Sequence, residues 1–114
     1  MKVAIVGSRG YSRLDEVRQF VRECERSTTI VSGGASGVDS AAVDEARRLG
    51  MTYEVYLPDW AVHGRAAGAI RNRIIVESAD EVVAFWDGAS KGTKISMDFA
   101  TQMHKPLKVF KEPR

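Results

Sequence analysis

Strand-length apolar runs alternate with segments of helical periodicity along the whole chain, and this alternation limits the possible folds more than any other feature. The run at residues 2–6 is nearly continuously apolar, as a parallel strand buried on both faces requires. Between the runs, apolar residues recur at spacings of three and four, as at Leu14, Val17 and Val21, which predicts four amphipathic helices. The expected strands span residues 2–6, 28–31, 53–57, 81–86 and 107–110.

This pattern predicts an α/β fold with a Rossmann-like, doubly wound parallel sheet of five strands. Crossovers between parallel strands are right-handed, and the simplest arrangement has the strand order 3-2-1-4-5 with helices on both faces. A chain of 114 residues is long enough to form one core without a disulfide or a metal. Since no linker or internal repeat divides the sequence, we expect a single domain over residues 1–114.

The sequence also gives expectations about the compartment. Cys24 is the only cysteine; it cannot form an internal disulfide, and we expect a small buried hydrophobe in a reducing environment. The N-terminal apolar run is too short for a signal peptide or a spanning helix. We therefore expect a cytoplasmic protein without a membrane partner.

Nine of the ten glycines follow a predicted strand and precede a predicted helix. In a parallel sheet these segments share one edge, where ligands of open α/β sheets bind, here between the first and fourth strands. A single glycine would be equally well explained by a tight turn, but nine at one edge indicate a binding site. The nine are Gly7, Gly10, Gly33, Gly34, Gly37, Gly64, Gly68, Gly88 and Gly92.

The loop at residues 32–37 is the strongest single signal, because its small residues and the helix that follows are typical of a phosphate cradle. Two nearby acids have alternative interpretations. Asp39 either contacts the ligand or completes a capping box with Ser36. Asp87 either accepts a hydrogen bond from a ribose hydroxyl or caps the turn through Gly88.

Basic side chains gather on or beside the same loops, although the net charge of +2 is too small to indicate a polyanionic partner by itself. We favour phosphate binding for Arg9 and Arg71, because a guanidinium beside a glycine loop suits bidentate contacts. Trp60 and Trp86 are expected to be packing residues. The further basic residues at this edge are Arg13, Arg65, Arg73, Lys91 and Lys94.

Several chemistries lack their sequence signals. His63 and His104 have no partners at ligand spacing, so we expect no metal site. The first glycine loop lacks the full dinucleotide fingerprint, and no segment matches the Walker pattern. We therefore expect no cofactor, and no catalytic residue can be assigned.

Four segments, at residues 7–9, 32–39, 64–72 and 85–93, resemble the SLOG superfamily, which joins the DNA-processing protein A domain with the Lonely guy phosphoribohydrolases. The resemblance is greatest to its small YspA/YpsA-related branch. It spans nearly the whole chain and implies a Rossmann-like fold that binds nucleotides or their derivatives, often as a homodimer. The apolar residues Ile70, Ile74, Ile75 and Val76 agree with a homodimer, because they exceed one core-facing stripe.

The chain departs from the hydrolase members of that superfamily. Where their Pro-Gly-Gly loop and catalytic glutamate would fall, it has Gly88-Ala89-Ser90 and Ser96. We therefore expect binding of a phosphate-bearing nucleotide or derivative, and a sensor is one protein type with that activity. The alternative is a nucleoside monophosphate phosphoribohydrolase or an ADP-ribose-type N-glycosidic hydrolase. Single-stranded nucleic-acid binding is the least favoured alternative, because aromatics interleaved with basic residues are not evident. The expected ligand-binding residues are Gly7, Ser8, Arg9, Gly33, Gly34, Ala35, Gly37, Asp39, Arg71, Asn72, Asp87, Gly88, Ser90, Gly92 and Thr93.

Overall fold

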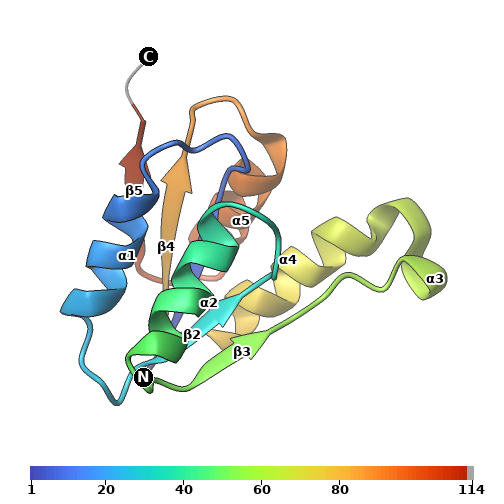
Figure 1. Ribbon diagram of the computed structural model, residues 1–114. Helices are drawn as coiled ribbons and strands as arrows, with labels where there is room; N and C mark the ends of the chain where they lie inside the picture. Colours follow the sequence, from blue (N-terminus) through green and yellow to red (C-terminus); the bar gives the residue numbers. More distant parts are fainter. Residues whose placement is uncertain (113–114) are drawn as a thin grey trace.

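The computed structural model describes residues 1–112 and shows one five-stranded parallel sheet with the order β3-β2-β1-β4-β5. The predicted fold class and strand order are therefore confirmed (Figure 1). The strands are β1 (Lys2–Gly7), β2 (Thr29–Ser32), β3 (Tyr53–Val55), β4 (Glu81–Trp86) and β5 (Leu107–Lys111). The helices are α1 (Leu14–Glu23), α2 (Val38–Arg48), α3 (Trp60–His63), the 3-10 turn η1 (Gly64–Ala66), α4 (Ala67–Ser78) and α5 (Lys91–Gln102).

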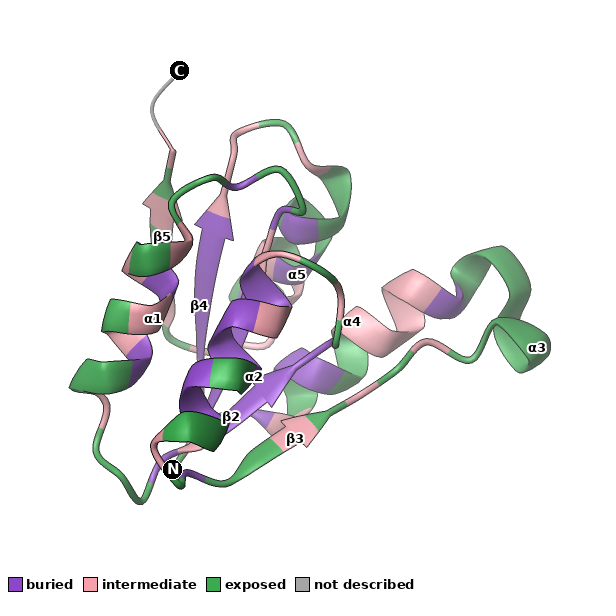
Figure 2. Cartoon of the chain, in the orientation of Figure 1, coloured by how far each residue is buried: buried purple, intermediate pink, exposed green. Residues whose placement is uncertain are grey.

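Helices cover both faces of the sheet, and the strand residues alternate between two cores. Val3 and Ile5 of β1 pack with α1 and α2 on one face. Ala4 and Val6 of the same strand pack with α4 and α5 on the other. The central strands are consequently buried along almost their whole length (Figure 2), which explains why their sequences are continuously apolar.

The structure differs from the sequence prediction at the third strand. β3 ends at Val55, two residues earlier than expected, because its ladder with β2 ends where Ser32 pairs with Val55. The N–H of Tyr56 donates the last bond to the Ser32 carbonyl, at 2.9 Å. The chain then continues into α3 and η1, two short elements that the sequence did not predict.

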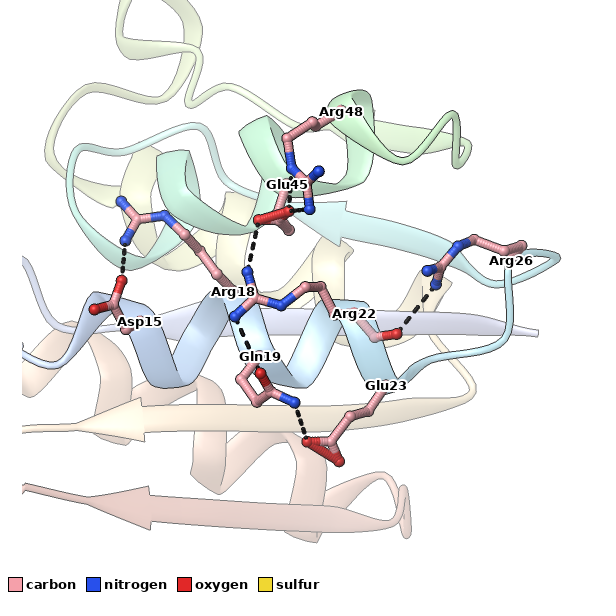
Figure 3. Close-up of polar contacts among 8 residues, drawn as sticks. All are labelled: Asp15, Arg18, Gln19, Arg22, Glu23, Arg26, Glu45 and Arg48. Carbon is pink, nitrogen blue, oxygen red and sulfur yellow. Dashed lines mark hydrogen bonds and ion pairs between the residues drawn. The ribbon is translucent and has the colours of Figure 1, made fainter.

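A buried carboxylate joins α1 to α2 on the face opposite α4 and α5. Glu45 of α2 is only 4% exposed, and it pairs with Arg22 of α1 at 3.5 Å and with Arg48 of its own helix. Figure 3 shows both arginines converging on this one side chain. A carboxylate so deeply buried needs charged partners, so this cluster fixes how the two helices pack.

Two smaller expectations can be compared with the structure. Cys24 is half-buried against the first core, and its thiol donates to the Phe20 carbonyl at 3.4 Å. Ile75 and Val76 are buried in the second core, whereas Ile74 is exposed, so the apolar surface available for self-association is smaller than expected. The homodimer stays a prediction.

None of the helices within residues 1–112 has the length and apolar character needed to cross a membrane.

The end of β1 lies unusually close to the start of α2. A β carbon built on Gly7 would stand 2.5 Å from the Cβ and both Cγ atoms of Val38. Such a distance is far below van der Waals contact, so only glycine allows the first turn of α2 to rest on this strand.

Replacing Gly7 with alanine should therefore lower the free energy of unfolding, by roughly 1–3 kcal/mol, because the new methyl group overpacks this contact. Urea unfolding followed by circular dichroism measures the change. Gly92→Ala is the matched control, since a β carbon there meets no atom within 4 Å. Equal stability of Gly7→Ala and the wild type would contradict the contact.

Candidate functional site

A pocket of about 400 Å³ lies at the carboxyl edge of the sheet, where the segments after β1, β2 and β4 meet α4. This is the reversal point of the strand order, the usual ligand position in such sheets. It brings together most of the predicted site residues and adds Val6, Gly10, Ile75 and Ser96. The predicted residues that line it are Gly7, Arg9, Gly33, Ala35, Asp39, Arg71, Asn72, Asp87, Ser90, Gly92 and Thr93.

Arg71 reaches from α4 across the pocket to the loop after β2. Its Nη1 donates to the Gly33 carbonyl at 2.7 Å, and its Nε donates to the Asn72 side chain at 2.8 Å. Asn72 in turn donates to the Gly92 carbonyl at the start of α5, at 3.4 Å. Burial lowers the pKa of the Arg71 guanidinium, an effect that the Asp39 carboxylate opposes. These two residues thus connect three walls of the pocket.

Asp39 fills the predicted phosphate cradle with its own carboxylate. Its Oδ2 accepts a hydrogen bond from the Ala35 N–H at 3.1 Å, and the Gly34 N–H donates to the Ser32 hydroxyl at 3.3 Å. The cradle therefore does not offer these N–H groups to a ligand, which corrects the interpretation from sequence. Nor does Asp39 form a capping box with Ser36, because α2 begins after Gly37 without a side-chain cap.

Asp39 is only 7% exposed, and this burial is the largest influence on the pKa of its carboxyl group. It raises the pKa of the carboxyl to about 6, against the lowering effect of the Ala35 and Gly33 N–H groups and of the Arg71 and Arg9 charges. The carboxylate is therefore an internal anion that partly neutralises the arginines of the pocket.

Arg9 is the second cation that lines the pocket. It lies on the loop after β1, lines the pocket and is exposed. Among residues 1–112 it makes no hydrogen bond or ion pair. All the donors of its guanidinium are consequently available to an anion.

The remaining wall joins the loop after β4 to the N-terminus of α5. The Asp87 carboxylate accepts from the N–H groups of Ala89 and Ser90, both at 2.8 Å, so the turn-capping alternative is the one the structure shows. Ser90 then caps α5 by accepting from the Thr93 N–H at 3.4 Å. The hydroxyls of Ser8 and Thr93, 3.3 Å apart, connect this wall to the loop after β1.

Four predicted residues lie outside the pocket lining and shape it from behind. Ser8 is buried and accepts from the Asp87 N–H at 3.2 Å. Gly34, Gly37 and Gly88 have positive φ angles, which glycine adopts without strain. Four lining residues were not among the expected ligand-binding residues. Ser96 is buried and donates to the Gly92 carbonyl at 3.4 Å, and Gly10 is one of the nine glycines of this edge. Val6 and Ile75 gave no chemical signal.

The other basic residues of this edge do not line the pocket. Arg13, Arg73 and Lys94 form ion pairs with acids on their own helices or next to them. Trp60 is 59% exposed, so the expectation that it is a packing residue is wrong. The ring of Trp86 is half-buried, and its Nε1 donates to the Ser90 carbonyl at 3.0 Å.

Comparison with known proteins gives the family. The family model for DNA recombination-mediator protein A matches residues 1–59. The chain is also 35% identical to the Gene 61 protein of Mycobacterium phage D29, over 93% of each sequence. It belongs to the DNA recombination-mediator protein A family. The resemblance to the SLOG superfamily is thereby confirmed.

Solved structures of this family share the fold. DNA processing protein A from Streptococcus pneumoniae matches with a TM-score of 0.81 and 25% identity, over 99% of this chain and 50% of that one. The Helicobacter pylori protein matches with a TM-score of 0.78 and 24% identity, over 99% and 66%. The chain thus spans half of one relative and about two thirds of the other.

These comparisons correct the predicted partner. The Helicobacter pylori structure describes a single-stranded DNA binding mode. The expectation of a small-molecule partner, with nucleic acid disfavoured, is therefore wrong. It failed because the basic and aromatic residues of this edge come from separate segments and are not interleaved along the sequence.

The raised pKa of Asp39 predicts a distinct pH dependence of stability. Between about pH 4 and pH 6 the folded protein holds a proton that the unfolded chain has lost, so the free energy of unfolding falls as the pH rises. Relative to Asp39→Asn, which lacks this group, the fall should total roughly 3 kcal/mol. Urea unfolding of both proteins across this range measures the difference, and parallel curves would contradict a raised pKa.

Proposed function

We propose that this chain binds single-stranded nucleic acid and holds one backbone phosphate in the pocket between Arg9 and Arg71. We further propose that residues 1–114 act as one domain. The observation that carries the proposal is the unpaired Arg9 guanidinium at the pocket of this family member. The Helicobacter pylori relative, which has the same fold, binds single-stranded DNA.

The cationic side of the pocket supports an anionic ligand. Arg9 has all its donors free, and Arg71 uses only Nε and Nη1 in the contacts described above. The N-terminus of the 12-residue helix α5 opens onto the same pocket through Gly92 and Thr93, and its dipole adds positive potential there.

Asp39 favours a phosphodiester over a free nucleotide. A terminal phosphate carries nearly two negative charges at neutral pH, whereas each phosphodiester of a strand carries one. Because the buried carboxylate takes the Ala35 N–H, the loop does not offer that donor to the additional charge of a terminal phosphate, whereas a singly charged phosphodiester can be held by side chains alone. The hydrolase alternative gains no support, since Ser96 stands at the position of the acid and its hydroxyl donates to a backbone carbonyl.

Arg9→Ala should weaken the binding of a fluorescent 20-nucleotide oligothymidylate by roughly 10- to 150-fold, because it removes a charge-assisted phosphate contact. The slope of log K against log salt should also become shallower by about 0.7. Fluorescence anisotropy measures both quantities. Arg47→Ala is the matched control: it removes the same charge from the far end of α2, where the side chain is exposed.

Equal losses in Arg9→Ala and Arg47→Ala would show that only net charge matters and would contradict the assigned site. A duplex of the same length serves as the second comparison. Tighter binding of the duplex than of the single strand by the wild type would contradict the single-strand assignment.

A further inference from the structure

Residues 57–65 form an exposed apolar projection, here called the Trp60 arm. It includes α3 and extends beyond the N-terminal end of α4, away from the sheet (Figure 1). Three of its large apolar residues are mostly exposed: Leu57 by 71%, Trp60 by 59% and Val62 by 70%. Figure 2 shows the α3 segment in the colour of exposed residues. Large apolar side chains exposed together on one projecting segment are typical of an interaction site.

The arm contacts two segments that border the pocket. The Cδ2 atom of Leu57 lies 2.9 Å from where a β carbon of Gly34 would stand, so this side chain rests on the loop after β2. The Cη2 atom of Trp60 lies 3.8 Å from the equivalent position on Gly68. Gly68 is one helical turn before Arg71 and Asn72, on the same face of α4. The indole therefore contacts α4 one helical turn, a rise of about 5.4 Å along the helix axis, before the two pocket residues.

The charge around the arm favours a polyanion. Residues 57–77 contain three arginines and two acids, and one of the acids, Glu77, pairs with Arg73 at 2.9 Å. Arg65 makes no hydrogen bond or ion pair within the described chain, and the nearest acid, Asp59, caps α3 by accepting from the Val62 N–H at 3.1 Å. A two-fold contact between two copies through the arm would bring the two Arg65 side chains together, whereas a nucleic-acid strand would neutralise this charge.

We propose that the Trp60 arm is a platform on which nucleobases stack, next to the phosphate held in the pocket. The inference rests on the proposed function and adds the base contacts that the pocket alone lacks. A strand lying along α4 would place a phosphate between Arg9 and Arg71 and a neighbouring base on the Trp60 indole. Arg65 would then pair with another phosphate. Stacking of this kind tolerates any base sequence.

Trp60→Ala tests the platform, with oligothymidylate and an abasic strand of the same length as the two probes. Loss of the indole should weaken oligothymidylate binding by roughly 5- to 150-fold, the range that one stacked base supplies. Binding of the abasic strand should not change, because its phosphates still reach Arg9. Trp60→Phe should restore part of the loss. Tyr53→Ala is the matched control, an exposed aromatic at the start of β3, outside the arm.

The outcomes separate the two proposals. If Trp60→Ala binds oligothymidylate as tightly as the wild type while Arg9→Ala binds it weakly, the platform is wrong and the phosphate site stands. If the wild type binds neither probe, both proposals fail. If Trp60→Ala weakens both probes equally and also lowers the mass measured by light scattering, the arm is a self-association surface, and the platform is again wrong.

Discussion

The site depends on the close approach of α2 to the end of β1, which the absence of a side chain at Gly7 allows. Because Val38 rests directly on that strand, the next residue, Asp39, is placed between the loop after β2 and the pocket. The same contact brings Gly37 against the Arg9 backbone, with 3.2 Å from its β-carbon position to the Arg9 carbonyl oxygen. Packing at Gly7 thus positions both the Asp39 carboxylate and the Arg9 loop.

Asp39 changes what this edge of the sheet can bind. In many Rossmann-like folds the backbone N–H groups of a glycine loop receive a phosphate; here the carboxylate accepts one of them. In the proposed function, anion recognition consequently passes to side chains, chiefly Arg9 and Arg71, which can follow a strand that lies across the edge. The arrangement is stable because buried polar groups find partners within the protein: within the described residues, no buried side-chain nitrogen or oxygen lacks one.

The sheet and the position of the pocket could be predicted because apolar period and glycine placement are local signals. The role of Asp39 could not, since its bond to the Ala35 N–H spans four residues and the alternative cap with Ser36 spans three, so the sequence offers both. Trp60 was expected to be packed because burial is the usual state of tryptophan; only the early end of β3 reveals that its segment leaves the sheet. Family comparison was needed before single-stranded nucleic acid could be proposed as the partner.

Photochemical crosslinking of the full chain to oligothymidylate, followed by peptide mass spectrometry, tests the central claim most directly. The account predicts crosslinks within residues 57–72, which include the Trp60 arm and Arg71, and within the loops after β1 and β4. Crosslinks confined to the opposite side of the molecule, on α1 and β5 around Phe20 and Phe110, would contradict it.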